Sequence, residues 1–243
     1  MQAQGTMAND FPPLRALDES AIAAAELRHD PYDYAFAENA IALDKDAVLA
    51  DAPVIPHGGS YGLASLHYGP AFEMVIADLL SPRFRHLVER KFDMDLRANP
   101  PLILLTGDTT GHHDEGYAHP DSKHKIVTVI LGFSREWPYE GGRLRVLRSP
   151  DRNDYAFELA PVFGNLLMFR VSGDSWHGFL PQKGPCLNLQ LCYCDSESYV
   201  RRENLRHRIS AWGKSFAPLR KIMEMLPRHN PAARAMRQKR KPF

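Results

Sequence analysis

Residues 117–133 read YAHPDSKHKIVTVILGF, in which a histidine and an aspartate precede a long apolar run that begins at Lys125. A run of this length, rich in Val and Ile, is typical of a buried strand. Other short apolar runs surround it, separated by Gly, Pro, Asp and Asn. The six predicted strands are 102–106, 125–133, 142–149, 154–160, 165–171 and 186–194. Short strands that follow one another without helices between them predict an antiparallel sandwich or barrel.

Before these strands the hydrophobic pattern becomes that of helices. Residues 69–96 predict two helices, the second with Ser81 as its N-cap and Pro82 in its first turn. The predicted fold class is therefore mainly β with flanking helices (α+β). We expect three parts, namely an N-terminal extension that packs on the core (1–66), helices with the β core (67–200), and a basic helical segment with a disordered end (201–243).

Composition is that of an ordinary globular chain, with 243 residues of which 44% are hydrophobic and 24% charged. No stretch approaches the length that spans a membrane, and the N-terminal residues lack the pattern of a secretory signal. The cysteines, Cys186, Cys192 and Cys194, are odd in number and lie close together, which argues against a disulfide framework. We expect a cytoplasmic protein.

The C-terminal segment is basic, although the net charge of the whole chain is only +1. From Arg201 onward, thirteen Lys or Arg residues stand against two Glu. The start of this segment predicts a helix whose apolar stripe faces the body, formed by Leu205, Ile209, Trp212, Phe216, Leu219, Ile222 and Leu226. We favour a docking helix with a disordered end over a weak contact with an anionic surface, and we expect no nucleic-acid partner.

Three side chains form a candidate metal site. His119 and Asp121 are two residues apart, so on extended backbone both point to one side. His177 follows Asp121 by 56 positions and lies between two predicted strands. In a double-stranded jelly roll, we expect the strand after Asp121 and the strand at His177 to be hydrogen-bonded neighbours. Two imidazoles and one carboxylate leave coordination positions open, which suits Fe(II) that handles oxygen better than a closed zinc site.

With this motif, residues 100–194 resemble the Fe(II)- and 2-oxoglutarate-dependent oxygenases, in the branch that includes prolyl 4-hydroxylases. The resemblance is carried by His119-Pro120-Asp121, the strand that follows, Gly141-Gly142 with Leu144, the GNLLMFR run, and Ser175-Trp176-His177-Gly178. It implies a double-stranded β-helix (jelly roll, cupin-like) in which His119, Asp121 and His177 hold Fe(II). It also implies 2-oxoglutarate and O2 as cosubstrates, and hydroxylation of a small molecule, a glycan or a side chain.

The chain departs from the family pattern where the second carboxylate of 2-oxoglutarate is bound. The resemblance implies a basic residue on the last strand, but Cys186 occupies that position, and Gly132 replaces a tyrosine of many relatives. Either another cation substitutes, with Arg170 and Lys183 the candidates, or the neutral Asn188 and Gln190 bind the group. The alternatives are an Fe(II) enzyme that does not use 2-oxoglutarate and a non-catalytic jelly roll.

Three further motifs have simpler interpretations. The sequence GGSYG (58–62) matches the G-x-S-x-G motif of serine hydrolases at Ser60, but prolines precede it and no βα units follow, so we favour a flexible glycine-rich loop. GHHDEG (111–116) resembles a metal cluster, but adjacent histidines on extended backbone diverge. Cys192 and Cys194 are best interpreted as buried thiols in the wall of the barrel.

Overall fold

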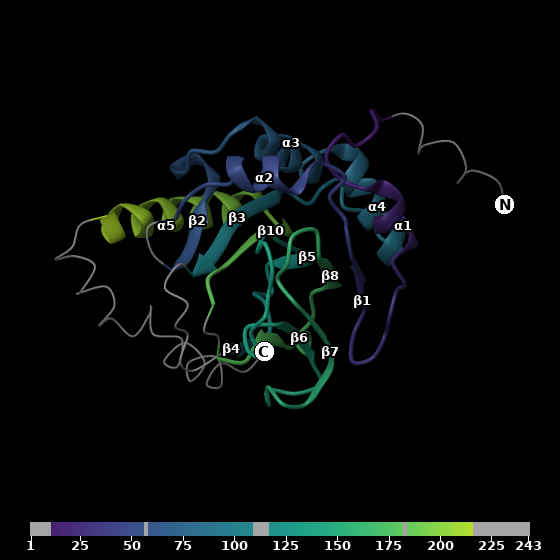
Figure 1. The fold of residues 1–243 in the computed structure, drawn as a ribbon. Helices are drawn as coiled ribbons and strands as arrows, with labels where there is room; N and C mark the ends of the chain where they lie inside the picture. The colour runs from purple at the N-terminus through teal and green to yellow at the C-terminus, as the bar shows by residue number, and fades with distance from the viewer. Residues whose placement is uncertain (1–10, 56–57, 109–116, 182–183, 216–243) are drawn as a thin grey trace.

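The computed structural model describes residues 11–55, 58–108, 117–181 and 184–215. Two antiparallel sheets form its centre (Figure 1), which confirms the predicted antiparallel β architecture. The larger sheet has the strand order β1-β8-β5-β10-β3-β2, and the smaller has the order β4-β9-β6-β7. The strands are β1 Tyr34–Ala37, β2 Gly59–Gly62, β3 Pro101–Asp108, β4 Tyr117–His119, β5 Lys125–Gly132, β6 Leu144–Leu147, β7 Tyr155–Leu159, β8 Leu166–Arg170, β9 His177–Phe179 and β10 Cys186–Cys194.

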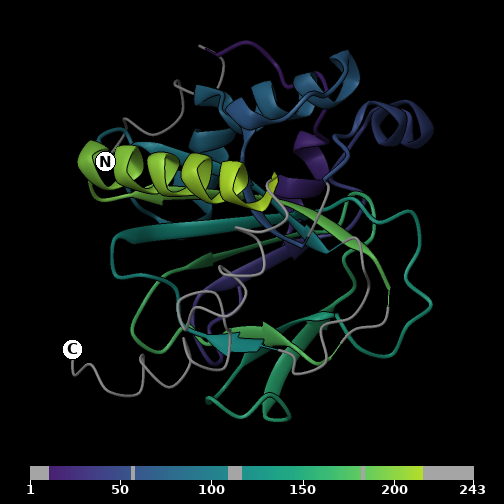
Figure 2. The same ribbon diagram turned by 90° about the vertical axis from the view of Figure 1, so that its left-hand side faces the viewer.

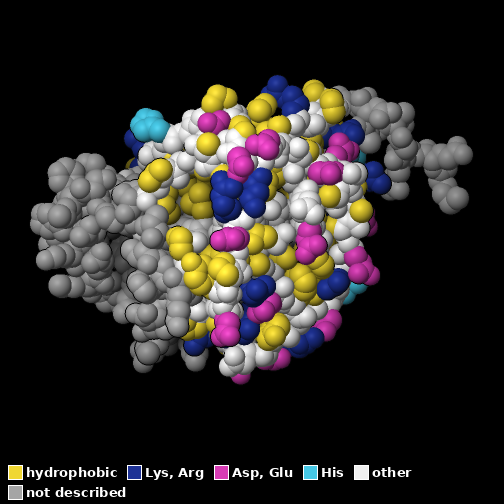
Figure 3. All heavy atoms as spheres, in the orientation of Figure 1, with side chains coloured by type: hydrophobic (Ala, Val, Ile, Leu, Met, Phe, Trp, Pro, Cys, Tyr) yellow, Lys and Arg dark blue, Asp and Glu magenta, His cyan; other side chains and the backbone are white. Residues whose placement is uncertain are grey.

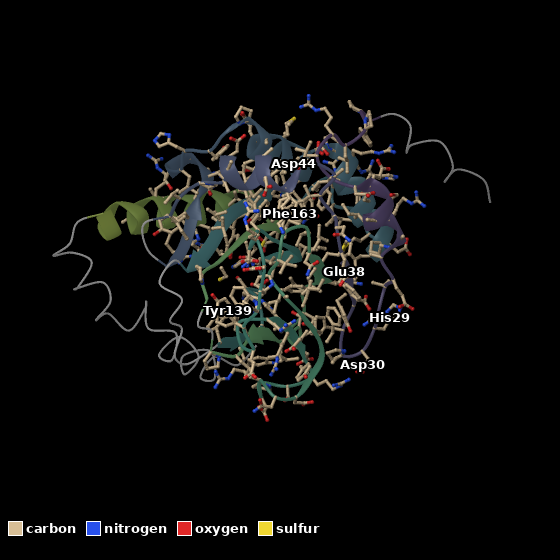
Figure 4. All side chains as sticks on the ribbon, viewed as in Figure 1. His29, Asp30, Glu38, Asp44, Tyr139 and Phe163 are labelled. Atoms are coloured by element: carbon tan, nitrogen blue, oxygen red, sulfur yellow. The ribbon has the colours of Figure 1, made fainter. Side chains whose placement is uncertain are left out.

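Four helices cover the outer face of the larger sheet (Figure 1), and these are α1 Glu19–Ala24, α2 Lys45–Asp51, α3 Pro70–Leu79 and α4 Pro82–Phe92. The start of α4 confirms the prediction, because the Ser81 side chain accepts a hydrogen bond from the backbone N–H of Phe84 and Pro82 occupies the first turn. Most of the buried hydrophobic side chains lie between this helical layer and the sheet. Figure 4 shows Phe163 beneath α2, where its ring meets that of Phe133 edge to face.

The central strand β10 separates the two sides of the larger sheet. Its leucines and Tyr193 point into the core under the helices, whereas Cys186, Asn188 and Gln190 point toward the smaller sheet. This alternation follows from the two-residue period of a strand, and it confirms that the polar face of β10 lines an internal cavity.

Three strands, β1, β2 and β4, were not predicted from the sequence, and β9 was expected only as a strand at His177 without bounds. Each is only three or four residues long, too short to show a period in hydrophobicity. The strand β2 corrects the interpretation of residues 58–62 as a flexible loop, because Ser60 pairs with Thr106 of β3 at the edge of the larger sheet. Backbone hydrogen bonds form such an edge strand without requiring particular side chains.

Helix α5, Glu197–Ser215, follows β10 directly and packs on the inner face of β2, β3 and β10 (Figures 1 and 2). The predicted helix is present, but its predicted inward face is wrong at both positions described. Leu205 and Ile209 are 55% and 59% exposed, whereas Tyr199, Val200 and His207 are buried. The side chains of residues 210–215 and the predicted disordered end (216–243) lie outside the described residues.

The surface in Figure 3 mixes charges of both signs. Lys and Arg side chains alternate there with Asp and Glu, so this face carries no extended basic patch. No helix in the described part of the chain combines the length and the apolar character that a membrane span requires.

Candidate active site

His119 and His177 come from two neighbouring strands of the smaller sheet. His119 ends β4, His177 begins β9, and the two residues are direct partners in the antiparallel ladder. Their ring centroids are 4.4 Å apart. This corrects the predicted strand pairing, since the strand after Asp121 is β5, which belongs to the larger sheet and pairs with β8 and β10. The strand that ends at His119, rather than the strand that follows Asp121, brings the two histidines together.

Asp121 completes the group from the connection between β4 and β5. One ligand atom from each of His119, Asp121 and His177 lies within 4.8 Å of the others, a spacing at which all three can hold a single metal ion. The donors are two nitrogens and one oxygen from a mostly buried site. Three protein donors would leave coordination positions open for exogenous ligands, as in non-haem Fe(II) oxygenases.

Backbone carbonyls orient both imidazoles. Nδ1 of His119 lies 2.9 Å from the carbonyl oxygen of Pro120, and Nδ1 of His177 lies 3.0 Å from that of Ser175. A carbonyl only accepts hydrogen bonds, so Nδ1 carries the proton in each ring. Nε2 is therefore left with its lone pair, as metal ligation requires.

The protonation states at the site also favour metal binding. Burial lowers the pKa of His119 to about 3 and lowers that of His177, so both rings are neutral at physiological pH. Burial alone would raise the pKa of Asp121, but the charge and hydrogen bond of Lys125, together with the neighbouring His177 and His119, outweigh it and hold the pKa below its usual value. Neutral imidazoles and an ionised carboxylate are the forms that bind divalent metals.

Both oxygens of Asp121 accept hydrogen bonds from β5. Nζ of Lys125 lies 2.6 Å from Oδ1, and the hydroxyl of Thr128 lies 2.7 Å from Oδ2. Lys125 reaches this position through a β-bulge, because Cys194 pairs with Lys125 and leaves Ile126 without a direct partner on β10. The extra residue places the Lys125 and Thr128 side chains on the same face of β5.

The three candidate ligands line a cavity of about 370 Å³ between the two sheets and α5. The larger sheet contributes Leu102, Leu104, Thr106, Ile130, Gly132, Asn165, Cys186, Asn188 and Gln190. The smaller sheet and its loops contribute Tyr117, Gly142, Leu144, Leu159, Gly178 and Phe179, and α5 contributes Tyr199, Glu203, Arg206 and His207. The cavity thus combines an apolar wall from the smaller sheet with a polar wall from β10 and α5.

The structure separates the residues predicted to bind the cosubstrate. Asn188 and Gln190 line the cavity, as predicted, together with Cys186. Arg170 does not, because it is exposed at the end of β8, so its predicted role as the substitute cation is not supported. Lys183 lies outside the described residues.

Gly132 cannot be replaced by a side chain at this position of β5. A Cβ atom there would lie 2.5 Å from the carbonyl oxygen of Val162 and 2.7 Å from the backbone of Pro161. Close approach of the chain around Pro161 therefore requires glycine, and the site has no room for the tyrosine of relatives.

Two basic side chains in the cavity wall were missed by the sequence analysis. Lys125 lies only four residues after Asp121, and its place at the start of a strand was the available signal. Arg206 lies on α5, and no local motif connects it to the site. Its role depends on how α5 packs on the sheet, which the helical pattern alone does not give.

Within the described residues, neither Ser60 nor the pair Cys192 and Cys194 forms a second catalytic site. Ser60 lies within the edge strand β2, followed by the 3₁₀ helix Leu63–Ser65, so the strand-turn-helix geometry of a nucleophile elbow is absent and the serine hydrolase hypothesis is wrong here. Cys192 and Cys194 are fully buried, as predicted for thiols in the wall, and burial raises the pKa of both. The GHHDEG segment (111–116) lies outside the described residues.

Comparison with known proteins shows which proteins the chain is similar to. Residues 103–189 match the family model of the 2OG-Fe(II) oxygenase superfamily. None of the curated proteins is significantly similar to the chain in sequence. A prolyl-4-hydroxylase structure from Pseudomonas putida has a TM-score of 0.52 at 17% identity, over 74% of this chain and 96% of that chain. A prolyl 4-hydroxylase from Phytophthora capsici is more distant, with a TM-score of 0.45 at 14% identity, over 66% of this chain and 58% of that chain.

The likeness to the Pseudomonas putida structure shows a common fold, the predicted jelly roll with flanking helices. The matched segment runs from β3 to β10 and includes all three residues of the His-Asp-His group. Over residues 103–189 the chain is therefore similar to the 2OG-Fe(II) oxygenase superfamily, a group of Fe(II)-dependent oxygenases that use 2-oxoglutarate.

Proposed function

We propose that His119, Asp121 and His177 bind one Fe(II) ion, and that the protein uses it with 2-oxoglutarate and O2 to hydroxylate a small molecule or a glycan. The observation that carries the proposal is the convergence of the three ligand atoms within 4.8 Å at the wall of an internal cavity. When bound, the iron supplies the oxidising chemistry of the family. The rest of the function depends on how the protein's own residues shape the site.

Lys125 and Thr128 would keep the iron ligand Asp121 in place. Each holds one carboxylate oxygen, at 2.6 Å and 2.7 Å respectively, so the carboxylate has little freedom to rotate. Hydrogen bonds from outside the metal shell fix the orientation of a ligand group. In the same way, the carbonyls of Pro120 and Ser175 would hold the two imidazoles with Nε2 directed at the metal.

The size and lining of the cavity support a small substrate. At about 370 Å³, it is near the lower end of the range of roughly 300–1,000 Å³ for small-molecule sites. Its apolar wall excludes water from the metal side, whereas Thr106, Asn188 and Gln190 offer neutral hydrogen-bonding groups. Neutral donors and acceptors beside apolar side chains suit a hydroxylated or amide-bearing molecule.

Iron binding by the His177→Ala variant tests the proposal. Removal of one of three protein ligands should reduce Fe(II) affinity by roughly 100-fold or more, since even loss of an outer partner costs about 10- to 100-fold. The measurement is an anaerobic Fe(II) titration of the full chain by calorimetry. The matched control is His124→Ala, because His124 lies near the site but pairs with Asp195 rather than with the metal group.

In the same titration, the control should bind Fe(II) as the parent does. Equal Fe(II) affinity of His177→Ala and the parent would overturn the assignment of the three ligands. Activity provides the second measurement, since succinate formation from 2-oxoglutarate should require both O2 and an intact His177.

A further inference from the structure

Binding of 2-oxoglutarate inside the cavity needs a positive charge that β10 does not provide. A carboxylate that leaves water without a cationic partner is destabilised, and a charge-assisted contact offsets that cost. Cys186, Asn188 and Gln190, the residues of β10 that line the cavity, are all neutral. A cation for the second carboxylate must therefore come from another element.

Among the described lining residues, only two side chains other than histidines are basic, Lys125 and Arg206. Lys125 is 12% exposed and lies 2.6 Å from Asp121 Oδ1, so its charge already serves the candidate metal ligand. Arg206 is different, because its side chain is 48% exposed and comes from α5 rather than from the sheet.

Helix α5 directs a row of polar side chains into the cavity. Glu203 follows Tyr199 by four residues, and Arg206 and His207 follow Glu203 by three and four, which places them on one face of the helix. The helix packs against β2, β3 and β10, so this face lies beside the strands that carry Thr106 and Asn188. In Figure 2, α5 runs across the larger sheet on this side. Arg206 thus lines the same cavity as the strand that lacks the basic residue.

The guanidinium of Arg206 is held in position and still has donors to offer. Its Nε and Nη2 donate to Glu203 Oε2, and Nη2 also lies 3.0 Å from Nε2 of His207. Within the described part of the chain, Nη1 makes no hydrogen bond. A guanidinium oriented by one carboxylate can donate its remaining N–H groups to a second one.

We propose that Arg206 on α5 binds the second carboxylate of 2-oxoglutarate. It would take the role of the basic residue that relatives carry at the position of Cys186. This inference rests on the proposed function, since it assumes that the metal site binds the 2-oxo acid end of the same molecule. Asn188 and Gln190 would add neutral hydrogen bonds from β10. Glu203 would orient Arg206 and at the same time weaken the binding of a dianion by its own negative charge.

The test compares two ligands on the full-length, Fe(II)-loaded protein by anaerobic calorimetry. One is 2-oxoglutarate, and the other is 2-oxopentanoate, which has the same chain but a methyl group in place of the second carboxylate. Arg206→Ala should weaken binding of 2-oxoglutarate by roughly tenfold or more, as loss of a charge-assisted partner does. It should leave binding of 2-oxopentanoate within about twofold of the parent. Misfolding of the variant would weaken the binding of both ligands.

Two further variants sharpen the comparison. Arg201→Ala removes an exposed arginine of the same helix that does not line the cavity, and it should change neither affinity. Glu203→Gln keeps a hydrogen-bonding group beside Arg206 but removes the competing charge, so it should tighten binding of 2-oxoglutarate alone. Opposite effects of Arg206→Ala and Glu203→Gln on the affinity for 2-oxoglutarate are expected only if a positive charge at Arg206 binds the anionic group.

The inference is overturned if Arg206→Ala binds 2-oxoglutarate as the parent does, or if it weakens both ligands equally. It is also overturned if the parent takes up Fe(II) but does not bind 2-oxoglutarate. Because Fe(II) uptake is titrated first in every sample, failure of the metal site is recognised separately from failure of Arg206.

Discussion

At the scale of single residues, the sequence reveals the candidate metal ligands but not the groups around them. His119 and Asp121 share a short motif, and His177 lies in a second one, so local patterns suffice to find them. Lys125 and Arg206 carry no such signal, because their positions depend on a bulge in β5 and on the packing of α5. Cys186 was predicted to leave β10 without a basic residue, and the lining of the cavity agrees.

The pairing of Lys125 with Asp121 leads to a prediction about stability. Without metal, Lys125 provides the positive charge next to a buried carboxylate, and its removal should cost about 3–5 kcal/mol of unfolding free energy. With a divalent ion bound, the ion supplies that charge, so the cost should be smaller. Lys125→Met should therefore show a larger rise in melting temperature on addition of Mn(II) than the parent does.

Lys91→Met provides the control for this comparison. Lys91 is also partly buried, but it donates to the backbone carbonyls of Ala23 and Ala25, far from the candidate metal site in the sequence. Its loss should lower the melting temperature equally with and without Mn(II). If Lys125→Met behaves in the same way as Lys91→Met, Lys125 does not compensate the charge of Asp121.

At the scale of elements, the longer strands were predicted, whereas β1, β2 and β4 were not. The strand β10 has nine residues with an alternating pattern, whereas β4 and β9 have three each. These short strands form through backbone pairing that places His119 opposite His177, a long-range contact that local propensity does not encode. The pairing of β4 with β9 therefore had to come from the structure.

Helix α5 shows why an apolar stripe can mislead. Its inner side faces a polar cavity near Glu203 and His207, so the leucine and isoleucine of the stripe are left outside.

Leu205→Ser and Ile209→Ser should each change the unfolding free energy by less than about 0.5 kcal/mol. Val200→Ala should cost about 1–2 kcal/mol, because Val200 is buried against Leu102 and Leu104.

Chemical denaturation of the three variants measures these differences. All three positions lie on the same helix, where helix propensity favours Ala over Val and Leu over Ser, so propensity works against the expected difference and cannot produce it. If substitution of Leu205 or Ile209 lowers the unfolding free energy as much as substitution of Val200 does, the apolar stripe is covered in solution.

At the scale of the whole molecule, the candidate metal site lies where the two sheets are joined. His119 and His177 belong to the smaller sheet, and Asp121 lies in the connection that leads to β5 of the larger sheet. The fold class was predictable because many strands repeat the same pattern, but the position of this junction depends on strand order. Other contacts between distant segments are weaker. One example is the ion pair of Asp30 and Arg148, which is exposed to solvent. Asp30 lies at the far end of the loop before β1 (Figure 4).

A metal ion bound at this junction should slow local opening of the chain around it. Opening of residues 117–125 releases the metal, so their backbone amides should exchange with solvent deuterium about 100-fold more slowly at a metal concentration of about 100 times Kd. Amides at the ends of α2, a short exposed helix on the opposite side of the larger sheet, open without releasing the metal and should keep their rates. Hydrogen–deuterium exchange with and without Mn(II) measures both regions in one experiment. Unchanged exchange at 117–125 in the metal-loaded parent, or equal slowing in His177→Ala, would show that the ion does not join the two sheets at this site.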